Sequence, residues 1–200
     1  MLVKEGDKMK KLNICIDIDG TITDPYYWLS YANTYFNSNI SESQVTSYDI
    51  AKVLNINRSE YLEFYEKFKT KIHSNQELRN DVKVTLDKLY ESNNIYFVTA
   101  RDKSLELLTL VYLKKHELQF NEVFVLGTPN KVPTAMDLNC DIFIEDSYDN
   151  AVQLSNSGFK VILIDTNYNR LPLNDNIIRV YNWNEVFEIV NEILKVKKAI

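Results

Sequence analysis

Four acidic residues follow or close two short apolar runs of the sequence. Asp17 and Asp19 come after the run LNICI, and Glu145 and Asp146 close the run DIFIED. Carboxylates held close together repel one another and raise one another's pKa values unless a cation compensates them. Oxygen ligands of this kind favour a hard cation such as Mg²⁺, which shares its coordination shell with a substrate phosphate. The four carboxylates therefore predict a magnesium site, provided that folding brings them together.

Two potential phosphate-binding residues accompany the acidic ones. Thr99 ends the apolar run IYFVT, and Lys131 lies in the loop after the run EVFVL. A hydroxyl and an ammonium group both donate hydrogen bonds to phosphoryl oxygens. A carboxylate nucleophile, a metal ion, a lysine and a second carboxylate are the parts of a phosphoryl-transfer site. Taken singly, Thr99 is a common strand residue and Lys131 a common loop residue. The prediction that they bind phosphate therefore depends on their order relative to Asp17.

The apolar runs that carry these residues alternate with stretches of helical spacing. The runs of strand length are 12–17, 95–99, 122–126, 141–145, 160–164 and 177–181. Apolar strands alternating with helices predict an α/β fold with a doubly wound parallel sheet. The strand ends of such a sheet converge on one crevice, so we expect the acidic residues, Thr99 and Lys131 to meet there.

The segment 24–79 has no convincing strand pattern. Tyr27, Tyr31 and Tyr35 recur at every fourth residue, and residues 59–72 have the apolar stripe of an amphipathic helix. A helical insertion after the first strand is placed to cover the carboxyl edge of the sheet. The predicted parts are a catalytic core of residues 9–23 and 80–200, a helical cap of residues 24–79, and a disordered leader of residues 1–8.

The order of these motifs resembles that of the haloacid-dehalogenase (HAD) superfamily of phosphotransferases. The matching motifs are DIDGT at 17–21, the threonine of FVTAR at 99, Lys131, and the pair ED at 145–146. The sequences IFIEDSYDNA and VILIDTNYN make the chain more similar to 5′(3′)-deoxyribonucleotidases and their bacterial relatives. This resemblance implies a Rossmann-like HAD core and Mg²⁺-dependent hydrolysis of nucleoside monophosphates through an aspartyl-phosphate. The alternative is a HAD phosphatase of another small ester, a sugar phosphate or phosphoglycolate.

The same resemblance implies a role for each matching residue. Asp17 would attack phosphorus, while Asp19 would protonate the leaving alcohol and then activate the hydrolytic water. Asp17, the backbone carbonyl of Asp19 and Asp146 would bind the metal. Thr99 and Lys131 would hold the phosphoryl group.

Several nearby residues keep open roles. Glu145 departs from the Asp-Asp pair common in the superfamily, and it could reach the metal through water. Either Asp149 or Asn150 could contact a metal ligand without binding the metal itself. Arg101 is balanced between a phosphate contact and a surface salt bridge, and both histidines are expected to be bystanders.

Three aromatic residues follow the DIDGT motif closely: Tyr26, Tyr27 and Trp28. Aromatic residues of this spacing most often form the core of a helical segment. Their position next to the predicted catalytic loop gives a second interpretation, in which one or two of them stack on a nucleobase.

Composition limits the partners. A net charge of −5 disfavours binding to a nucleic-acid polymer, which requires a basic surface. No apolar run approaches the roughly 20 residues that span a bilayer. Cys15 and Cys140 belong to no disulfide or metal pattern, which favours a reduced, cytoplasmic protein. The expected partner is a small phosphate ester, in the first place a nucleotide, and the oligomeric state stays open.

Overall fold

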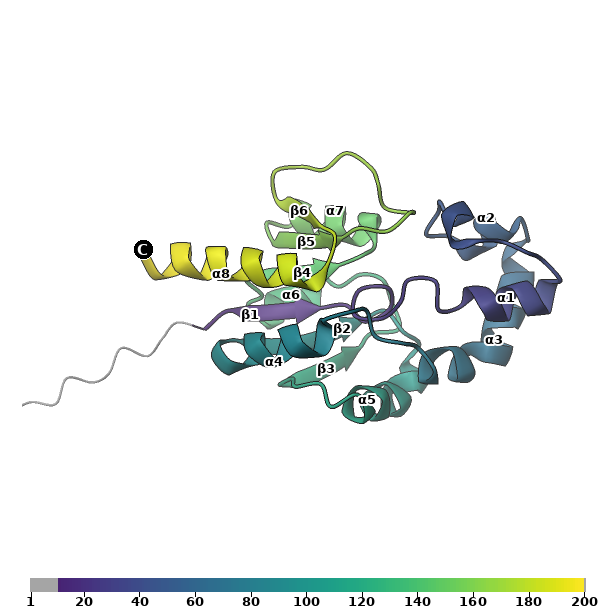
Figure 1. Ribbon diagram of the computed structural model, residues 1–200, viewed down its shortest axis with the longest axis horizontal. Coiled ribbons are helices and arrows are strands. Elements are labelled where there is room, and N and C mark those ends of the chain that lie inside the picture. The colour runs from purple at the N-terminus through teal and green to yellow at the C-terminus, as the bar shows by residue number, and fades with distance from the viewer. Residues whose placement is uncertain (1–10, 200) are drawn as a thin grey trace, which may run out of the picture.

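A six-stranded parallel sheet forms the centre of the computed structural model, which describes residues 11–199 (Figure 1). Its order is β3-β2-β1-β4-β5-β6, and every neighbouring pair is parallel. The strands are β1 (Asn13–Ile16), β2 (Asn94–Thr99), β3 (Glu122–Val125), β4 (Ile142–Glu145), β5 (Lys160–Ile164) and β6 (Ile177–Val180). The predicted α/β class with a doubly wound parallel sheet is confirmed, and the predicted leader of residues 1–8 lies outside the described residues.

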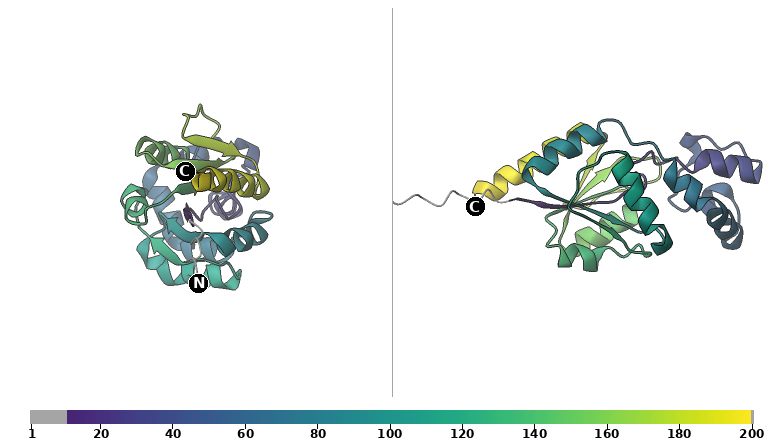
Figure 2. Two further views of the ribbon diagram at one scale, coloured as in Figure 1. Left: turned by 90° about the vertical axis from the view of Figure 1, so that its left-hand side faces the viewer. Right: turned by 90° about the horizontal axis from the view of Figure 1, so that it is seen from below.

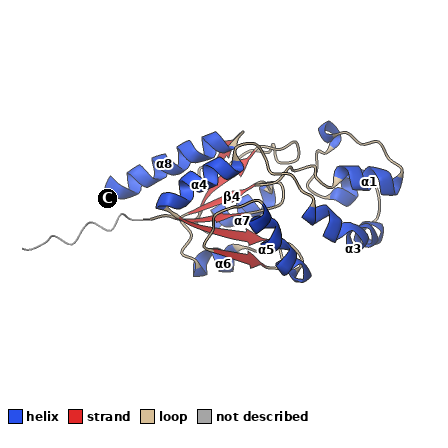
Figure 3. Ribbon diagram, turned by 60° about the horizontal axis from the view of Figure 1, so that its bottom comes forward, coloured by secondary structure: helices blue, strands red, loops and turns tan. Residues whose placement is uncertain are grey.

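Helices cover both faces of the sheet, which explains why its central strands are apolar on both sides. In β1, Ile14 and Ile16 pack into one buried cluster, and Cys15 packs into the other. The first cluster receives side chains from α4 (Val82–Ser92), α5 (Glu106–Lys115) and α8 (Trp183–Ala199). The second receives them from α6 (Val132–Asp137) and α7 (Tyr148–Asn156). Figure 3 shows α4 and α8 on one side of the strands and α6 and α7 on the other.

The segment between β1 and α4 is helical. It contains α1 (Leu29–Phe36), the 3₁₀ turn η1 (Glu42–Gln44), α2 (Ile50–Leu54) and α3 (Arg58–Ser74). These elements share an apolar cluster of their own, which includes Ala32, Phe64 and Ile72. They lie beyond the carboxyl ends of the strands, at the opposite end of the molecule from the end of α8 (Figures 1 and 2). The helices therefore stand over the edge of the sheet where the predicted catalytic residues end their strands.

The chain leaves the sheet for this segment at residues 22–24 and returns at residues 77–79, and these two stretches are hydrogen-bonded to each other. Thr23 and Leu78 form an antiparallel bridge, and Asp24 N donates to Glu77 O at 2.9 Å. Arg79 N donates to Ile22 O at 2.9 Å. The bridge fixes where α3 returns toward the sheet.

Two expectations from composition concern the whole chain. Within residues 11–199, no helix is both long and apolar enough to span a bilayer. Cys15 and Cys140 are both buried and free.

Candidate active site

Adjacent strand ends bring the predicted catalytic residues together. Asp17 directly follows β1, Thr99 ends β2 and Glu145 ends β4, and these three strands are neighbours in the order β2-β1-β4. Asp17 N donates to Ile144 O at 3.0 Å, so the backbone of Asp17 stays hydrogen-bonded to β4 beyond the last residue of β1. Lys131 precedes α6 and reaches the same place from the loop after β3.

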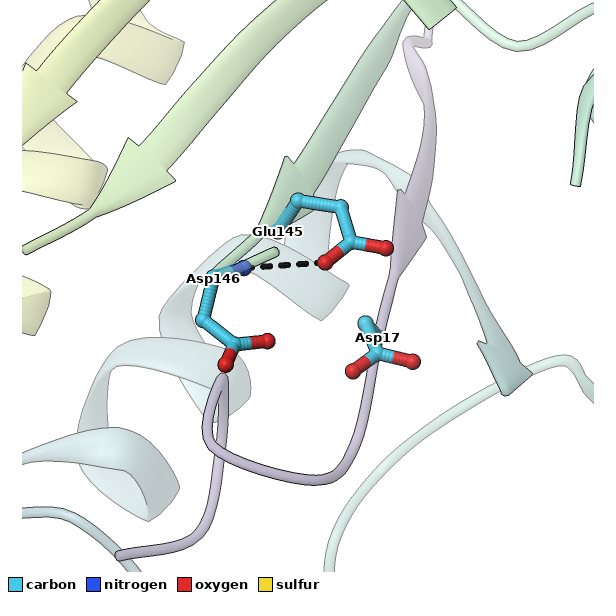
Figure 4. A group of neighbouring side chains, drawn as sticks. All are labelled: Asp17, Glu145 and Asp146. Carbon is cyan, nitrogen blue, oxygen red and sulfur yellow. Dashed lines mark hydrogen bonds between the residues drawn. The ribbon is translucent and has the colours of Figure 1, made fainter. Parts of the chain in front are cut away.

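We call Asp17, Lys131, Glu145 and Asp146 the strand-end cluster. Each of the three acidic residues offers one carboxylate oxygen, and these three oxygens lie within 4.8 Å of one another. Figure 4 shows the three side chains side by side. Lys131 Nζ lies 2.5 Å from Asp17 Oδ1 and 2.6 Å from Glu145 Oε1. All four side chains are buried. Three carboxylates thus face a single lysine, which leaves an excess of negative charge away from water.

The pKa values in the cluster record this excess. Burial and the neighbouring carboxylates raise the pKa of Asp17 well above its ordinary value, although Lys131 opposes the shift. Burial and the charge of Glu145 raise the pKa of Asp146 to about 7. Burial alone would lower the pKa of Lys131, but Asp17 and Glu145 outweigh it and raise that pKa. Each shift indicates that additional positive charge would stabilise the cluster.

The donor set fits a hard divalent cation. All available ligand atoms are oxygens, the ligand type of Mg²⁺ and Ca²⁺. Among described residues, none donates a hydrogen bond to Asp17 Oδ2 or to the backbone carbonyl of Asp19. Asp17, the Asp19 carbonyl and Asp146 therefore have oxygen lone pairs left for a metal ion.

Glu145 lies within the acidic group, but protein hydrogen bonds already use its carboxylate oxygens. Its four donors are Lys131 Nζ (2.6 Å), Asn150 Nδ2 (2.9 Å) and the backbone N–H groups of Asp146 (3.0 Å) and Ser147 (3.0 Å). A carboxylate with four hydrogen bonds has little capacity left for a metal ion. Glu145 instead holds Lys131 and the backbone of Asp146 in place, and Asn150 supports Glu145.

The two predicted phosphate-binding residues keep donors for a ligand. Thr99 is buried and its Oγ1 accepts from Arg101 N at 3.2 Å, which leaves the hydroxyl proton available. Lys131 has three N–H groups, of which Asp17 and Glu145 engage two. Both residues can therefore donate to a phosphoryl group next to Asp17.

A second group of polar residues surrounds Asp19, and we call Asp19, His73, Gln76 and Arg101 the bridging network. Arg101 Nε and Nη2 donate to the two carboxylate oxygens of Asp19, each at 2.8 Å. Gln76 Nε2 lies 2.5 Å from Asp19 Oδ1, and His73 Nδ1 lies 3.2 Å from the same oxygen. His73 and Gln76 belong to the end of α3 and the residues after it, so the network joins the inserted helices to the sheet.

Two interpretations of single residues change here. The side chain of Arg101 is 1% exposed, so its salt bridge is a buried one with Asp19 and not a surface contact. His73 is not a bystander, because α3 carries it back to the edge of the sheet and into contact with Asp19. Burial alone would raise the pKa of Asp19, but Arg101 and His73 hold it well below its ordinary value. Asp19 is therefore ionised in this arrangement.

Tyr168, which the motif order does not single out, also contacts the cluster. Its hydroxyl lies 2.5 Å from Asp146 Oδ2, while Thr21 Oγ1 donates to Asp146 Oδ1 at 3.0 Å. Gly20 has a φ of +81°, and a Cβ at this position would lie 2.4 Å from Asp146 Oδ2 and 2.7 Å from the Tyr168 hydroxyl. Glycine is thus required for this close approach. The run VILIDTNYN, which contains Tyr168, was the available sequence signal.

A cavity of about 380 Å³ opens between the strand ends and the inserted segment. Asp19, Arg101 and Asp146 border it from the sheet. Its aromatic lining residues are Tyr27, Trp28, Tyr48, Tyr61, Tyr65 and Tyr168. The cavity thus combines charged side chains at the edge of the sheet with aromatic rings, most of which come from the inserted segment.

The three predicted aromatic contacts have different positions. Tyr27 lines the cavity, and its ring centroid lies 5.8 Å from that of His73. Trp28 also lines the cavity, but it is 5% exposed and packs in the apolar cluster of the inserted segment. Tyr26 is not among the cavity-lining residues. Its hydroxyl accepts from Asn167 N at 3.2 Å.

Sequence comparisons identify relatives over nearly the whole chain. The family model described as 5′ nucleotidase, deoxy (pyrimidine), cytosolic type C protein (NT5C) matches residues 10–199. The chain is 58% identical over 192 residues to a nucleotidase of Clostridium acetobutylicum, covering 96% of this chain and 100% of that relative. It is 31% identical over 187 residues to the 5′(3′)-deoxyribonucleotidase of Bacillus subtilis, covering 89% of this chain and 97% of that relative.

Solved structures show the same fold. A HAD-like hydrolase of Streptococcus pneumoniae matches with a TM-score of 0.69 at 16% identity, covering 90% of this chain and 98% of that one. The HAD hydrolase YfnB of Bacillus subtilis, determined bound to magnesium, matches with a TM-score of 0.57 at 14% identity, covering 91% of this chain and 100% of that one. The predicted resemblance to the HAD superfamily and its nucleotidases is confirmed by the sequence and structural relatives together.

Proposed function

The chain belongs to the NT5C family of HAD-like nucleotidases and is a hydrolase of phosphoric monoesters, and from this premise we propose that it hydrolyses nucleoside monophosphates with Mg²⁺ and through an aspartyl-phosphate. The observation that carries the proposal is the strand-end cluster with its excess negative charge, placed beside a cavity with aromatic walls. The cluster suits a metal ion and a phosphoryl group, and the rings suit a nucleobase.

Asp17 is the proposed nucleophile. One of its carboxylate oxygens forms the bond to phosphorus, and the bond from phosphorus to the ester oxygen breaks. When held by Asp17, the Asp19 carbonyl and Asp146, Mg²⁺ supplies positive charge for the buried carboxylates and the phosphoryl oxygens. Lys131 and Thr99 donate hydrogen bonds to the phosphoryl group. Glu145, braced by Asn150, keeps Lys131 beside Asp17.

Asp19 is the proposed acid and base. It donates a proton to the leaving ester oxygen in the first step and takes one from water in the second. The second role suits the ionised carboxylate held by Arg101. The first role requires a protonated carboxyl, so we propose that substrate entry loosens Asp19 from Arg101.

We propose that residues 24–79 act as a cap and that residues 9–23 and 80–200 form the catalytic core. The separate apolar cluster of the inserted segment supports this division. Among the three predicted base contacts, Tyr27 is supported best, because it lines the cavity while remaining partly exposed. Trp28 supports the wall, and Tyr26 supports the loop around Asn167.

We further propose that the protein works in the cytoplasm on a small nucleotide and binds no nucleic-acid polymer. The free, buried thiols of Cys15 and Cys140 suit a reducing compartment. A net charge of −5 repels a polyanion, whereas a single phosphate can be received at a local site.

A substrate panel tests the proposal. We expect Mg²⁺-dependent release of phosphate from nucleoside monophosphates, with a higher kcat/KM than for sugar phosphates and phosphoglycolate. Excess chelator should abolish turnover, and added Mg²⁺ should restore it. A higher kcat/KM for a sugar phosphate or phosphoglycolate would support the alternative phosphatase. Full activity in chelator would overturn the role of the metal.

A further inference from the structure

We propose that Tyr168 is a positioning residue for metal binding, because its hydroxyl fixes the orientation of the Asp146 carboxylate. The inference rests on the proposed magnesium site at the strand-end cluster. Tyr168 lies in the loop between β5 and β6, outside the motifs that supply the proposed nucleophile, acid and phosphate-binding residues. Its only polar contact among described side chains is Asp146.

The two hydrogen bonds on Asp146 restrict its carboxylate without using it up. Oδ2 accepts from the Tyr168 hydroxyl at 2.5 Å, and Oδ1 accepts from Thr21 Oγ1 at 3.0 Å. A carboxylate oxygen has two lone pairs, so each oxygen keeps one for a metal ion. A carboxylate held at both oxygens loses less rotational freedom when it binds a cation. Partners that orient a ligand in this way strengthen metal binding.

The loop that carries Tyr168 is anchored to the same strand end. Asn169 Nδ2 donates to Asp146 O and to Ile164 O, each at 2.8 Å. Arg179 of β6 donates to Asn169 Oδ1 at 2.6 Å. The backbone on one side of Tyr168 is therefore tied to the residue that its hydroxyl contacts.

The ring of Tyr168 is also fixed. It packs edge-on against Tyr26 at 6.4 Å and against Tyr48 at 5.6 Å between centroids. Gly20 leaves the space for the hydroxyl, since a Cβ there would lie 2.7 Å from it. A ring held by neighbours on the inserted segment keeps the hydroxyl directed at Asp146, which is what a positioning role requires.

The opposite reading is that the Tyr168 hydroxyl competes with the metal for Asp146. In that case removal of the hydroxyl would tighten metal binding. The two readings predict changes of opposite sign, so a single substitution separates them.

The test is a calorimetric titration of Mg²⁺ into the full chain without substrate. We expect Tyr168→Phe, which keeps the ring, to raise the Kd for Mg²⁺ by about 10-fold or more, the scale found when a partner of a metal ligand is removed. Tyr148→Phe is the matched control, because its hydroxyl donates to Pro172 O on the surface and should leave the Kd unchanged. An unchanged or lower Kd for Tyr168→Phe overturns the inference.

Three further measurements separate this inference from the proposed function. Asp146→Asn should abolish Mg²⁺ binding; if it does not, the ion binds elsewhere and the proposed metal site fails together with the inference. If the wild type shows Mg²⁺-dependent nucleotidase activity but Tyr168→Phe binds Mg²⁺ normally, only the inference fails. The activity of Tyr168→Phe should recover at high Mg²⁺, and a loss that persists at saturating Mg²⁺ contradicts a positioning role.

A second variant covers the case in which Tyr168→Phe does not fold. Thr21→Val removes the hydrogen bond to the other oxygen of Asp146 with little change in volume. It should also raise the Kd for Mg²⁺. An unchanged Kd there contradicts the claim that hydrogen bonds at both oxygens orient Asp146.

Discussion

The strand-end cluster and the bridging network are neighbours in the candidate active site, but they differ in charge balance and in origin. The cluster takes all its residues from the strand ends and loops of the sheet and sets three carboxylates against Lys131. The network pairs one carboxylate, Asp19, with Arg101 and completes the contact with His73 and Gln76 from the inserted segment. The cluster is thus short of positive charge, and the network is not.

This difference separates two tasks. Buried carboxylates without sufficient counter-charge favour a cation and, with it, a phosphoryl group. A carboxylate already paired with an arginine gains little from a metal, but its pairing depends on where the helices of the inserted segment stand. We infer that the cluster serves the phosphoryl group, while the network connects proton transfer to the position of those helices.

The largest expected effect comes from the proposed nucleophile in the cluster, Asp17. Asp17→Asn should lower kcat by roughly 10⁵-fold or more, the scale known for loss of a covalent nucleophile. The substitution preserves shape, so circular dichroism should show an unchanged fold. Acid-quenched reactions with phosphate-labelled substrate should give protein-bound label in the wild type and none in the variant. Residual kcat within tenfold of wild type would assign the attack to another group.

Loss of the proposed general acid in the network, Asp19, should lower activity less than loss of Asp17, and the size of the loss should depend on the leaving group. Asp19→Asn should lower kcat/KM for a nucleoside monophosphate by ~10²–10⁴-fold, the usual contribution of a general acid–base. The loss should be smaller for a phenolic phosphate, because its leaving group needs less protonation. Steady-state kinetics with both substrates checks this. Equal losses for the two substrates would argue against acid catalysis by Asp19.

Removal of the only cation in the cluster should affect stability. Lys131→Met leaves Asp17 and Glu145 buried without their partner, and breaking such a pair costs about 3–5 kcal/mol of unfolding free energy. Denaturant unfolding measures the loss. Saturating Mg²⁺ should recover part of it, because the ion replaces positive charge. The exposed Lys103→Met should change stability by less than about 0.5 kcal/mol. A similar small change for Lys131→Met would show that the cluster tolerates its charge without compensation.

The smallest expected effect concerns the cavity wall. Tyr27→Ala should lower kcat/KM for a nucleotide by roughly 10-fold to 100-fold, since stacking on a base contributes ~1–3 kcal/mol. Activity on a small phosphate without a base should barely change. Trp28→Ala removes a buried side chain of the wall and should lower both activities together. Proportional losses on both substrates for Tyr27→Ala as well would assign Tyr27 to the structure of the wall and not to base recognition.

Patterns along the chain were enough to predict the sheet and the convergence of its strand ends. Apolar runs such as LNICI and DIFIED predict buried strands, because both faces of a central parallel strand are covered. The strands are found at these places, with ends that differ by at most one residue. Since the carboxyl ends of neighbouring parallel strands meet, the sequence also predicted that Asp17, Glu145 and Asp146 would come together.

Side-chain partners across the active site could not be predicted in this way. His73 and Gln76 are 54 and 57 residues from Asp19, and only the path of α3 back to the bridge at Thr23 and Leu78 brings them there. The sequence left the role of Glu145 open, with contact to the metal through water as one possibility, and only the packing shows its four hydrogen-bond donors.

The sequence by itself therefore determined the fold class and which residues stand at the strand ends, because burial and the alternation of strands with helices follow from local patterns of apolar and polar residues. The order of the motifs along the chain indicated the family. The tertiary structure alone decided how each charge is paired. Arg101 compensates Asp19, Lys131 is shared between Asp17 and Glu145, and the Tyr168 hydroxyl meets Asp146. These pairings depend on the distances between side chains of different elements, and the spacing of residues along one strand or helix does not contain that information.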